Sequence, residues 1–489
     1  MDVDSLKTTP GTTPMPAILL LLCSLLFPAA AALLPARAAA LVPEDARHLL
    51  ARSGFAATPA GIDALVGLSR ERAVADILEA AAARAAAGAV TPPPAWEAGW
   101  MPPQAAAMSE VERLALRNGL REQGRELKAW WLREMLVTPA PLTEVMTLFW
   151  HGHFTSGLAK VKAPVLLYRQ NALLRRHALG NFAALLRGIA RDPAMLVYLD
   201  NARSRRQAAN ENFARELLEL FTLGEGRYTE ADLKQAARAF TGWSVDPDSG
   251  SFRFRADWHD GGEKQIFGRS GTFGGDEVID LLLTRPETAV LIVEKLWRQF
   301  ISERPDPAEV DRLAAIFRDS GYEIRPLLAA LFAAEAFWAP QNRGRLVKSP
   351  IDFVVGTLRL FDLPAGDERD LAWLSRRLGQ DLFEPPDVKG WRGGTAWITG
   401  ASLLDRQALV ARITGSLATD GMTAAGGRME RRAAFFDRWT ARLPGHWQDA
   451  EAATLLLLPI PPVDSQVLDR RASGALLRSL LADPAYHLK

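Results

Sequence analysis

Two histidines lie one residue apart in LFWHGHF, residues 148–154, among large aromatic side chains. If the backbone is extended there, His151 and His153 point to the same side and can share a divalent metal ion or an anion. If a helix continues through both, only one ring can reach a given site. Gly152 between them permits a helix to stop, so both geometries stay open. The alternative to a metal ligand is a hydrogen-bonded histidine of the core.

The densest polar group is NENFARELLELFTLG, which begins at Asn210. On a helix, Glu211 and Arg215 share the side opposite the apolar stripe, while Asn212 and Glu216 lie one turn apart at its edge. Asn210 is best placed at the N-cap. A half-buried carboxylate needs a partner or a shifted pKa, so Glu216 is a candidate general base or metal ligand and Arg215 a candidate holder of an anionic group. The alternative is a solvated helix face with weak ion pairs.

A third polar group, DWHDGGEK, begins at Asp257. Its His259 and Asp260 have the side chains needed to bind a cation or to orient an imidazole as a general base. Aspartate and glycine are also the usual residues of a hairpin turn, so an ordinary turn is the alternative.

Helices must position most of these groups, because apolar residues recur at helical spacing along nearly the whole chain, as in residues 110–136 and 286–301. Thr229 followed by Asp232 predicts a capping box at the start of one helix. The exception is a short two-stranded β insertion near 252–268, in which FRFR and QIFG are separated by a polar turn. The sequence therefore predicts a mainly α fold, with one large irregular multi-helix domain over residues 41–489.

The composition of the chain limits the classes of function that are possible. Fifty-eight lysines and arginines against 57 acidic residues leave a net charge of +1, which gives no field toward nucleic acid. The one cysteine, Cys23, lies in an apolar N-terminal stretch that has the layout of a signal peptide over residues 1–40. We therefore expect a periplasmic or secreted protein without disulfides or cysteine-bound zinc. An uncleaved membrane anchor is the alternative for this stretch.

Tryptophan is the remaining candidate for ligand contact, with 14 in the chain. Trp243 in TGW, Trp391 in KGW and Trp397 have the flat faces that stack on sugar rings. Packing in a helical core is the alternative.

Several of these stretches together resemble a bacterial family labelled domain of unknown function 1800. The resemblance covers roughly residues 45–489 and suggests a large, mostly helical, single-domain exported protein, without implying a reaction. It rests on FWHGHFTSG, DPAMLVYLDNARSRRQAANENFARELLELFTLGEGRYTEADLKQAARAFTGW, WHDGGEKQIFGRSG, KLWRQFISERP, KSPIDFVVGTLRL and FEPPDVKGWRGGTAWI. The motif positions that it marks include Trp150, His151, His153, Asn210, Glu211, Asn212, Arg215, Glu216, Thr229, Gly242, Trp243, His259, Asp260, Lys348, Pro350, Pro386, Gly390 and Trp391.

Two functional hypotheses follow. The first is an exported, hydrolase-like enzyme, with Arg215, Glu216, His259 and Asp260 as the catalytic group and a divalent metal at His151 or His153 as an option. The second is a non-catalytic binding or assembly protein of the cell envelope with a glycan or protein partner, in which NENFAREL is a structural network. The residues predicted to bind the ligand are Asn210, Glu211, Asn212, Trp150, Trp243 and Trp391.

Overall fold

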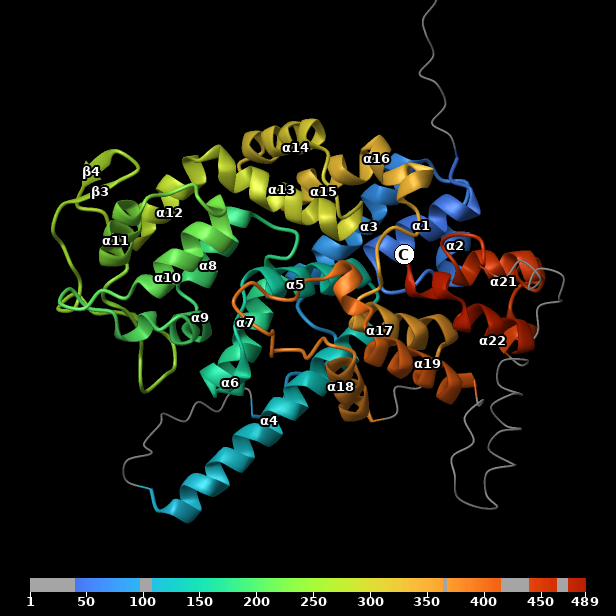
Figure 1. The fold of residues 1–489 in the computed structure, drawn as a ribbon, viewed down its shortest axis with the longest axis horizontal. Helices are drawn as coiled ribbons and strands as arrows, with labels where there is room; N and C mark the ends of the chain where they lie inside the picture. The colour runs from blue at the N-terminus through green and yellow to red at the C-terminus, as the bar shows by residue number, and fades with distance from the viewer. Residues whose placement is uncertain (1–39, 97–107, 364–366, 415–438, 464–473) are drawn as a thin grey trace, which may run out of the picture. The chain divides into compact units, whose positions relative to one another are not determined.

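The computed structural model describes residues 40–96, 108–363, 367–414, 439–463 and 474–489. Residues Ala39–Lys489 form one compact unit. Most of its described residues are helical, which confirms the predicted mainly α fold (Figure 1). The helices are α1 (Pro43–Ser53), α2 (Pro59–Leu65), α3 (Arg70–Ala87), α4 (Glu110–Val137), α5 (Pro141–His153), α6 (Leu158–Val161), α7 (Pro164–Arg176), α8 (Phe182–Ala190), α9 (Pro193–Tyr198), α10 (Glu211–Glu216), α11 (Glu230–Ala239), α12 (Gly275–Thr284), α13 (Pro286–Phe300), α14 (Pro307–Asp319), α15 (Ile324–Ala333), α16 (Glu335–Trp338), α17 (Pro350–Phe361), α18 (Glu368–Arg377), α19 (Gly400–Thr414), α21 (Ala450–Leu457) and α22 (Gly474–Ala482).

Side-chain caps fix where many of these helices begin. Asn210 is the N-cap of α10 and accepts a hydrogen bond from the backbone of Asn212 at 2.8 Å, as predicted. Thr229 and Asp232 form the predicted capping box of α11, each accepting from the backbone of the other. These local signals fix where α10 and α11 begin.

The strands form two separate two-stranded sheets, which corrects the predicted pairing of FRFR with QIFG. Strand β2 (Phe252–Phe254) pairs with β1 (Trp243–Val245), and β3 (Lys264–Ile266) pairs with β4 (Arg269–Gly271), both antiparallel. Phe267 and Gly268 both have positive φ, which is the geometry of a tight two-residue hairpin turn. The chain therefore reverses inside the stretch that was predicted to be a strand.

Helix α5 lies near the middle of the described unit and packs on α3, α4 and α7. A fully buried ion pair anchors it. Arg175 on α7 donates to both carboxylate oxygens of Glu144 on α5 at 2.6 and 2.8 Å, and Trp131 on α4 donates to the same carboxylate at 2.8 Å. Because a buried charge is tolerated only when it is paired and hydrogen-bonded, this network fixes α5 against two neighbours.

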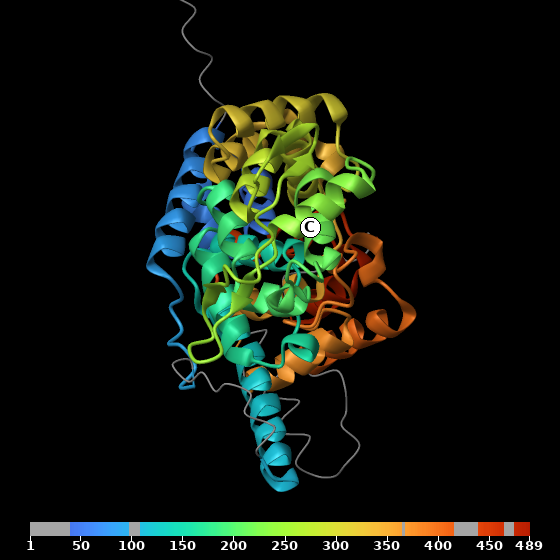
Figure 2. The ribbon, with the colours of Figure 1, turned by 90° about the vertical axis from the view of Figure 1, so that its left-hand side faces the viewer.

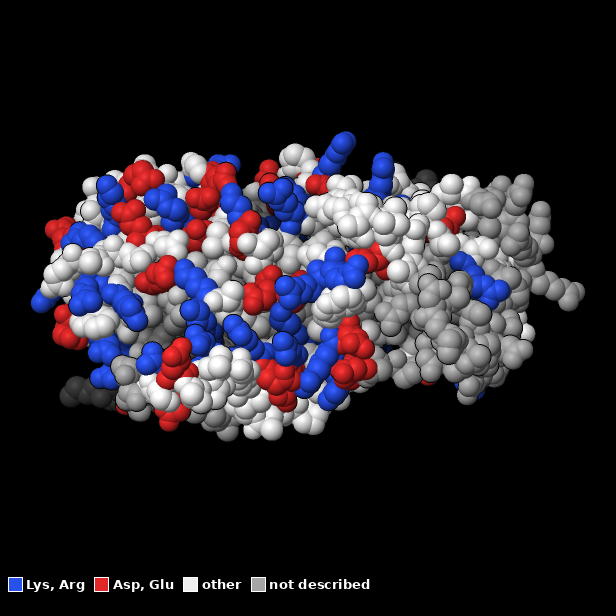
Figure 3. Space-filling model, turned by 60° about the horizontal axis from the view of Figure 1, so that its bottom comes forward, with Lys and Arg blue, Asp and Glu red and all other residues white. Residues whose placement is uncertain are grey.

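The N-terminal half of α4 extends beyond the helices around it, as Figure 2 shows from the side, and most of its side chains there are exposed. Among the helices that the structure describes, none is both long and apolar enough to cross a bilayer. On the face drawn in Figure 3, acidic and basic side chains are interspersed, as the small net charge leads one to expect.

Candidate functional site

The two histidines of LFWHGHF lie on a helix, because α5 continues to His153 and is followed by Phe154 at its C-cap. His151 packs among Trp131, Phe383 and Trp391, whereas His153 contacts Phe154 and Phe221. The rings therefore have different neighbours, which agrees with the helical alternative, in which only one of the two rings can reach a given site. Within the described part of the chain, no group of three histidine, cysteine, aspartate or glutamate side chains is arranged to hold a metal ion.

His153 is hydrogen-bonded to a partly buried lysine of α13. Lys295 Nζ lies 2.9 Å from His153 Nδ1 and donates to the carbonyl of Leu220 at 2.9 Å, while His153 Nε2 lies 3.3 Å from the carbonyl of Phe221. A carbonyl can only accept, so the hydrogen-bond network places the imidazole proton on Nε2 and leaves Nδ1 to accept from Lys295.

Electrostatics at this junction favours a neutral imidazole. Burial, together with the nearby Lys295 charge, holds the pKa of His153 well below its usual value. Burial, followed by the charge of Arg298, lowers the pKa of Lys295 to about 8. The amine of Lys295 therefore loses its proton much closer to neutral pH than an exposed lysine does.

The carbonyls at this junction come from a π-helix, η2 (Leu217–Leu223), which continues α10. Thr222 donates its hydroxyl to the carbonyl of Leu217, five residues back, at 2.6 Å. A π-helical turn is rare and is found frequently at functional sites. Through the carbonyls of Leu220 and Phe221, its C-terminal half contacts both Lys295 of α13 and His153 of α5.

The loop after α18 packs on the end of α5 through a glycine contact. Gly390 has φ of 78°, and a Cβ there would overlap the carbonyl oxygen of Gly152. Only glycine satisfies both demands. The contact brings Trp391 beside His151 and turns Arg392 and the short helix η4 (Gly394–Trp397) toward α13.

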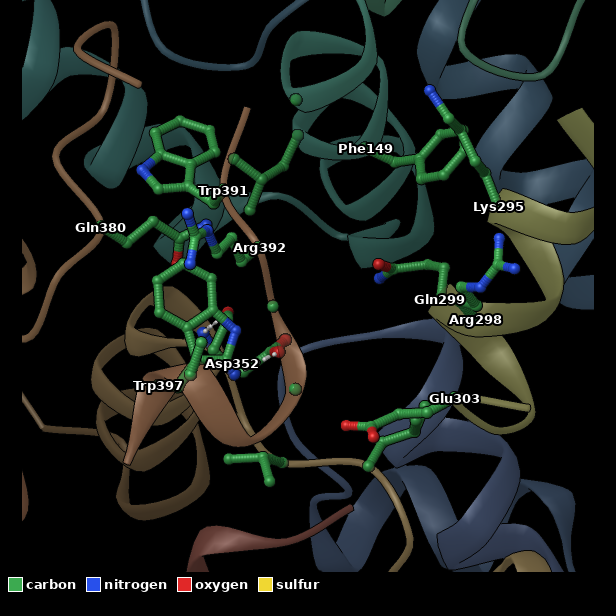
Figure 4. A pocket seen from close by; sticks show the side chains of 18 of the residues that line it. Phe149, Lys295, Arg298, Gln299, Glu303, Asp352, Gln380, Trp391, Arg392 and Trp397 are labelled. Carbon is green, nitrogen blue, oxygen red and sulfur yellow. Dashed lines mark hydrogen bonds between the residues drawn. The ribbon is translucent and has the colours of Figure 1, made fainter. Parts of the chain in front are cut away.

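Between this loop and α13 lies a pocket of about 600 Å³. Figure 4 shows two facing walls, with Trp391, Arg392 and Trp397 on one and Lys295, Arg298, Gln299 and Glu303 on the other. His153 and Gly152 of α5 also contribute to the lining. The polar and aromatic lining residues are Phe55, Phe149, His153, Lys295, Arg298, Gln299, Glu303, Ser349, Asp352, Gln380, Lys389, Trp391, Arg392, Thr395, Trp397 and Lys489.

The charges that line the pocket are unbalanced. Five lysines and arginines face two carboxylates, Glu303 and Asp352. Lys489 pairs with Asp352 at 2.7 Å, and Arg298 and Lys389 pair with Glu294 and Glu225 outside the lining at 3.1 and 2.7 Å. Within the described residues, Lys295 and Arg392 of the lining form no ion pair. A concave surface with excess positive charge and tryptophan faces is suited to an anionic ligand with a flat ring.

The NENFARE side chains lie beside this pocket and do not line it. Arg215 forms partly exposed ion pairs with Glu211 at 3.5 Å and Glu230 at 3.2 Å, as expected of a solvated face. Glu216 is 9% exposed, and burial followed by the charge of Glu219 raises its pKa, as predicted for a half-buried carboxylate. The charge of Lys389, at the pocket rim, acts on Glu216 in the opposite direction.

His259 and Asp260 belong to a different part of the structure, the connection between β2 and β3, which Figure 1 shows away from α5. Arg238 donates to both oxygens of Asp260 at 2.7 and 3.0 Å, and His259 Nδ1 lies 2.9 Å from the carbonyl of Thr241. The backbone of Asp260 accepts from Lys264. The structure therefore does not bring this pair to the pocket that His153 lines.

The predicted ligand-binding tryptophans also separate. Trp150 is 0% exposed and donates to the carbonyl of Ala178, and Trp243 is buried against Phe240. Both are core residues in this structure, whereas Trp391 and Trp397 line the pocket.

Sequence reasoning did not single out Lys295, Arg298, Gln299 or Arg392. A signal was present in KLWRQF, where Lys295, Arg298 and Gln299 recur at the spacing of one helical face beside the apolar stripe of α13. A polar face of this kind is usually solvated, so spacing alone does not distinguish a pocket wall from a surface.

Comparison with known proteins assigns the chain to a protein family. The family described as protein of unknown function (DUF1800) matches residues 48–488, and no curated protein and no solved structure gives a match. The matched segment includes the junction at Lys295 and both walls of the pocket. The chain belongs to this DUF1800 family over nearly its whole length.

Proposed function

We propose that this protein binds an acidic glycan of the cell envelope in the pocket between α13 and the loop of Trp391. The observation that carries the proposal is the lining itself, in which Lys295 and Arg392 have no ion-pair partner among the described residues and two tryptophans contribute aromatic rings. Guanidinium groups form bidentate hydrogen bonds with carboxylates and phosphates, and tryptophan stacks on sugar rings. Together these groups recognise a ring that carries an anionic substituent.

The N-terminal residues support a location for this activity. Residues 1–40 have the composition of a signal peptide, so we propose that the protein acts outside the cytoplasm, where acidic glycans of the envelope are found. The measurement is the N-terminal sequence of the protein recovered from cell fractions of an expressing bacterium. Recovery of an uncleaved chain in the cytoplasm would contradict export.

Calorimetric titration with oligogalacturonate tests the binding proposal. Its methyl ester is the matched control, because it keeps the sugar rings and loses the charge. We expect binding of the acid and at least tenfold weaker binding of the ester, because the carboxylate contacts to cationic side chains are lost. Equal affinity for both, or no binding of either, would overturn the proposal.

A pair of variants locates the ligand. Arg392→Ala removes an exposed cation of the pocket wall, and we expect it to weaken binding of oligogalacturonate about tenfold without lowering stability. Arg206→Ala removes an exposed arginine that does not line the pocket, and should leave the affinity unchanged. If both variants bind like the original protein, the ligand does not use this wall.

A hydrolytic enzyme is the second candidate, and the pair of Lys295 and His153 favours it. An amine with a pKa of about 8, hydrogen-bonded to a neutral imidazole beside a ligand pocket, has the properties of a general base. Glu216, whose pKa is raised, is the other basic group near the pocket rim. Chain shortening of oligogalacturonate, followed by mass spectrometry, distinguishes the candidates. An enzyme shortens the chain and loses this activity in Lys295→Met, whereas a binding protein leaves the chain intact.

A further inference from the structure

Behind the pocket lies a second, much smaller cavity of about 30 Å³. It shares Phe55, Asp352 and Lys489 with the large pocket, and most of its remaining lining comes from α1, α17 and the C-terminal segment. Its remaining polar lining consists of Arg47, Lys348 and Tyr486. Three basic side chains, Arg47, Lys348 and Lys489, therefore surround a space that contains one side-chain carboxylate, Asp352.

The basic side chains Arg47 and Lys348 of this cavity have few hydrogen-bond or ion-pair partners. Arg47 is 5% exposed, its Nε has no hydrogen-bond partner, and its Nη2 makes one long contact of 3.5 Å with the carbonyl of Leu457. The Lys348 amine lies 3.9 Å from the ring centroid of Tyr486, and among the described residues it forms no ion pair. Burial, followed by the charge of Arg47, holds the pKa of Lys348 well below its usual value, so the amine needs a nearby anion to stay protonated. The one carboxylate, Asp352, is already bonded to Lys489 Nζ at 2.7 Å and to the backbone of Ser349 at 3.0 Å.

More positive charge lies behind this lining. Arg406 is fully buried, donates to the carbonyl of Lys348 at 2.8 Å, and has no partner for its Nε and Nη1. Burial lowers the pKa of Arg47 and of Arg406 to about 10, so both guanidinium groups remain charged at neutral pH. Burial of charge without a counter-charge is strongly unfavourable, so this cluster attracts an anion of a size that the cavity can hold.

The cavity size selects the anion. A cavity that holds a single water molecule has a volume of roughly 10–15 Å³. A cavity of about 30 Å³ therefore accommodates one halide ion and is too small for sulfate, phosphate or a sugar acid. We propose that a halide ion, with chloride as the physiological example, binds in this cavity between the guanidinium of Arg47 and the side-chain nitrogens of Lys348 and Lys489. The site is distinct from the glycan pocket, and its existence does not depend on the proposed function.

Chloride NMR on the wild-type protein tests the proposal directly. We expect the ³⁵Cl line of excess chloride to be broadened by the protein and narrowed again by bromide, which competes for the cavity. Sulfate at equal ionic strength should leave the line broad because it does not fit. Absence of broadening, or equal displacement by sulfate and bromide, would overturn the proposal.

Thermal unfolding with a matched variant locates the site. The wild-type Tm in sodium chloride should exceed that in sodium gluconate of equal ionic strength by about 2–4 °C, at a chloride concentration near 100 times Kd. Lys348→Met should lose this difference, whereas Arg392→Met, which changes the large pocket alone, should retain it. A chloride effect that persists in Lys348→Met would overturn the assignment. If that variant does not fold, the bromide and sulfate arms on the wild type decide the question.

Discussion

The junction around Lys295 and the loop around His259 contain the same types of residue, but their polar groups are paired in different ways. Around His259, Arg238 is matched by both oxygens of Asp260, the imidazole contacts a carbonyl, and Lys264 caps two further carbonyls. Around Lys295, the amine meets an imidazole and a carbonyl, with no carboxylate for its charge among the described residues. The polar groups around His259 therefore pair with one another, whereas the charge of Lys295 is left for a ligand to neutralise.

This difference separates structure from function better than residue type does. A hydrogen-bond network in which each donor already has its acceptor contributes stability and has no free donor or acceptor for a ligand. A pocket with unmatched cations keeps a desolvation cost in the folded protein, which is typical of sites that bind a counter-charge. Each of the following variants changes one region and should leave the other unchanged.

The largest expected effect is that of Gly390→Ala in the pocket loop. The new Cβ would overlap the carbonyl oxygen of Gly152, so we expect a loss of about 2–4 kcal/mol in the free energy of unfolding and a large loss of oligogalacturonate affinity. Gly226→Ala is the matched control, since Gly226 has nearly the same φ and no neighbour within 4 Å. Chemical denaturation measures both variants. Equal losses would show that the contact with Gly152 contributes nothing.

The next effect is the pH dependence that Lys295 confers. Its folded pKa of about 8 lies below the unfolded value of 10.5, so the unfolded chain holds more protons between these values and wild-type stability rises with pH there. Lys295→Met removes this dependence. The difference in unfolding free energy between wild type and variant should therefore shift in favour of wild type by up to about 3 kcal/mol from pH 7.5 to 10.5.

Lys234→Met, at an exposed lysine of α11, serves as the control for this experiment. Its difference from wild type should stay constant over the same pH range. A constant difference for Lys295→Met as well would mean that the amine is not desolvated at the junction.

A smaller effect is expected from Asp260→Asn in the other region. Loss of the bidentate ion pair with Arg238 should lower the free energy of unfolding by about 2 kcal/mol, because both side chains are only partly exposed. The affinity for oligogalacturonate should remain within twofold of wild type. A large loss of affinity with unchanged stability would instead make Asp260 a functional residue and reverse the comparison.

The smallest effect is expected from Arg215→Ala on the exposed side of α10. Its ion pairs with Glu211 and Glu230 are partly exposed, and such pairs contribute about 0–0.5 kcal/mol. Urea denaturation and calorimetry should both give values close to wild type. A tenfold loss of affinity would restore the catalytic or anion-binding role that the sequence predicted for this residue.

The elements that depend on neighbouring residues were predictable. Asn210 as an N-cap and the capping box at Thr229 follow from side chains within one helical turn. The strand pairing was not predicted correctly, because the turn at Phe267 and Gly268 has no polar signal at its first position. The relative orientation of His151 and His153 depends on where α5 ends, and the sequence allowed both a helical and an extended backbone there.

The sequence by itself determined a helical chain, its caps, its family and the segments that contain polar residues, because these properties follow from local spacing and composition. Tertiary structure decided which segments meet. It brought α5, η2 and α13 together at Lys295, packed Gly390 on Gly152, and kept His259 in a separate network. The physical reason is that the charge imbalance of a pocket depends on which side chains from distant segments share a desolvated space, and this cannot be read from the order of residues along the chain.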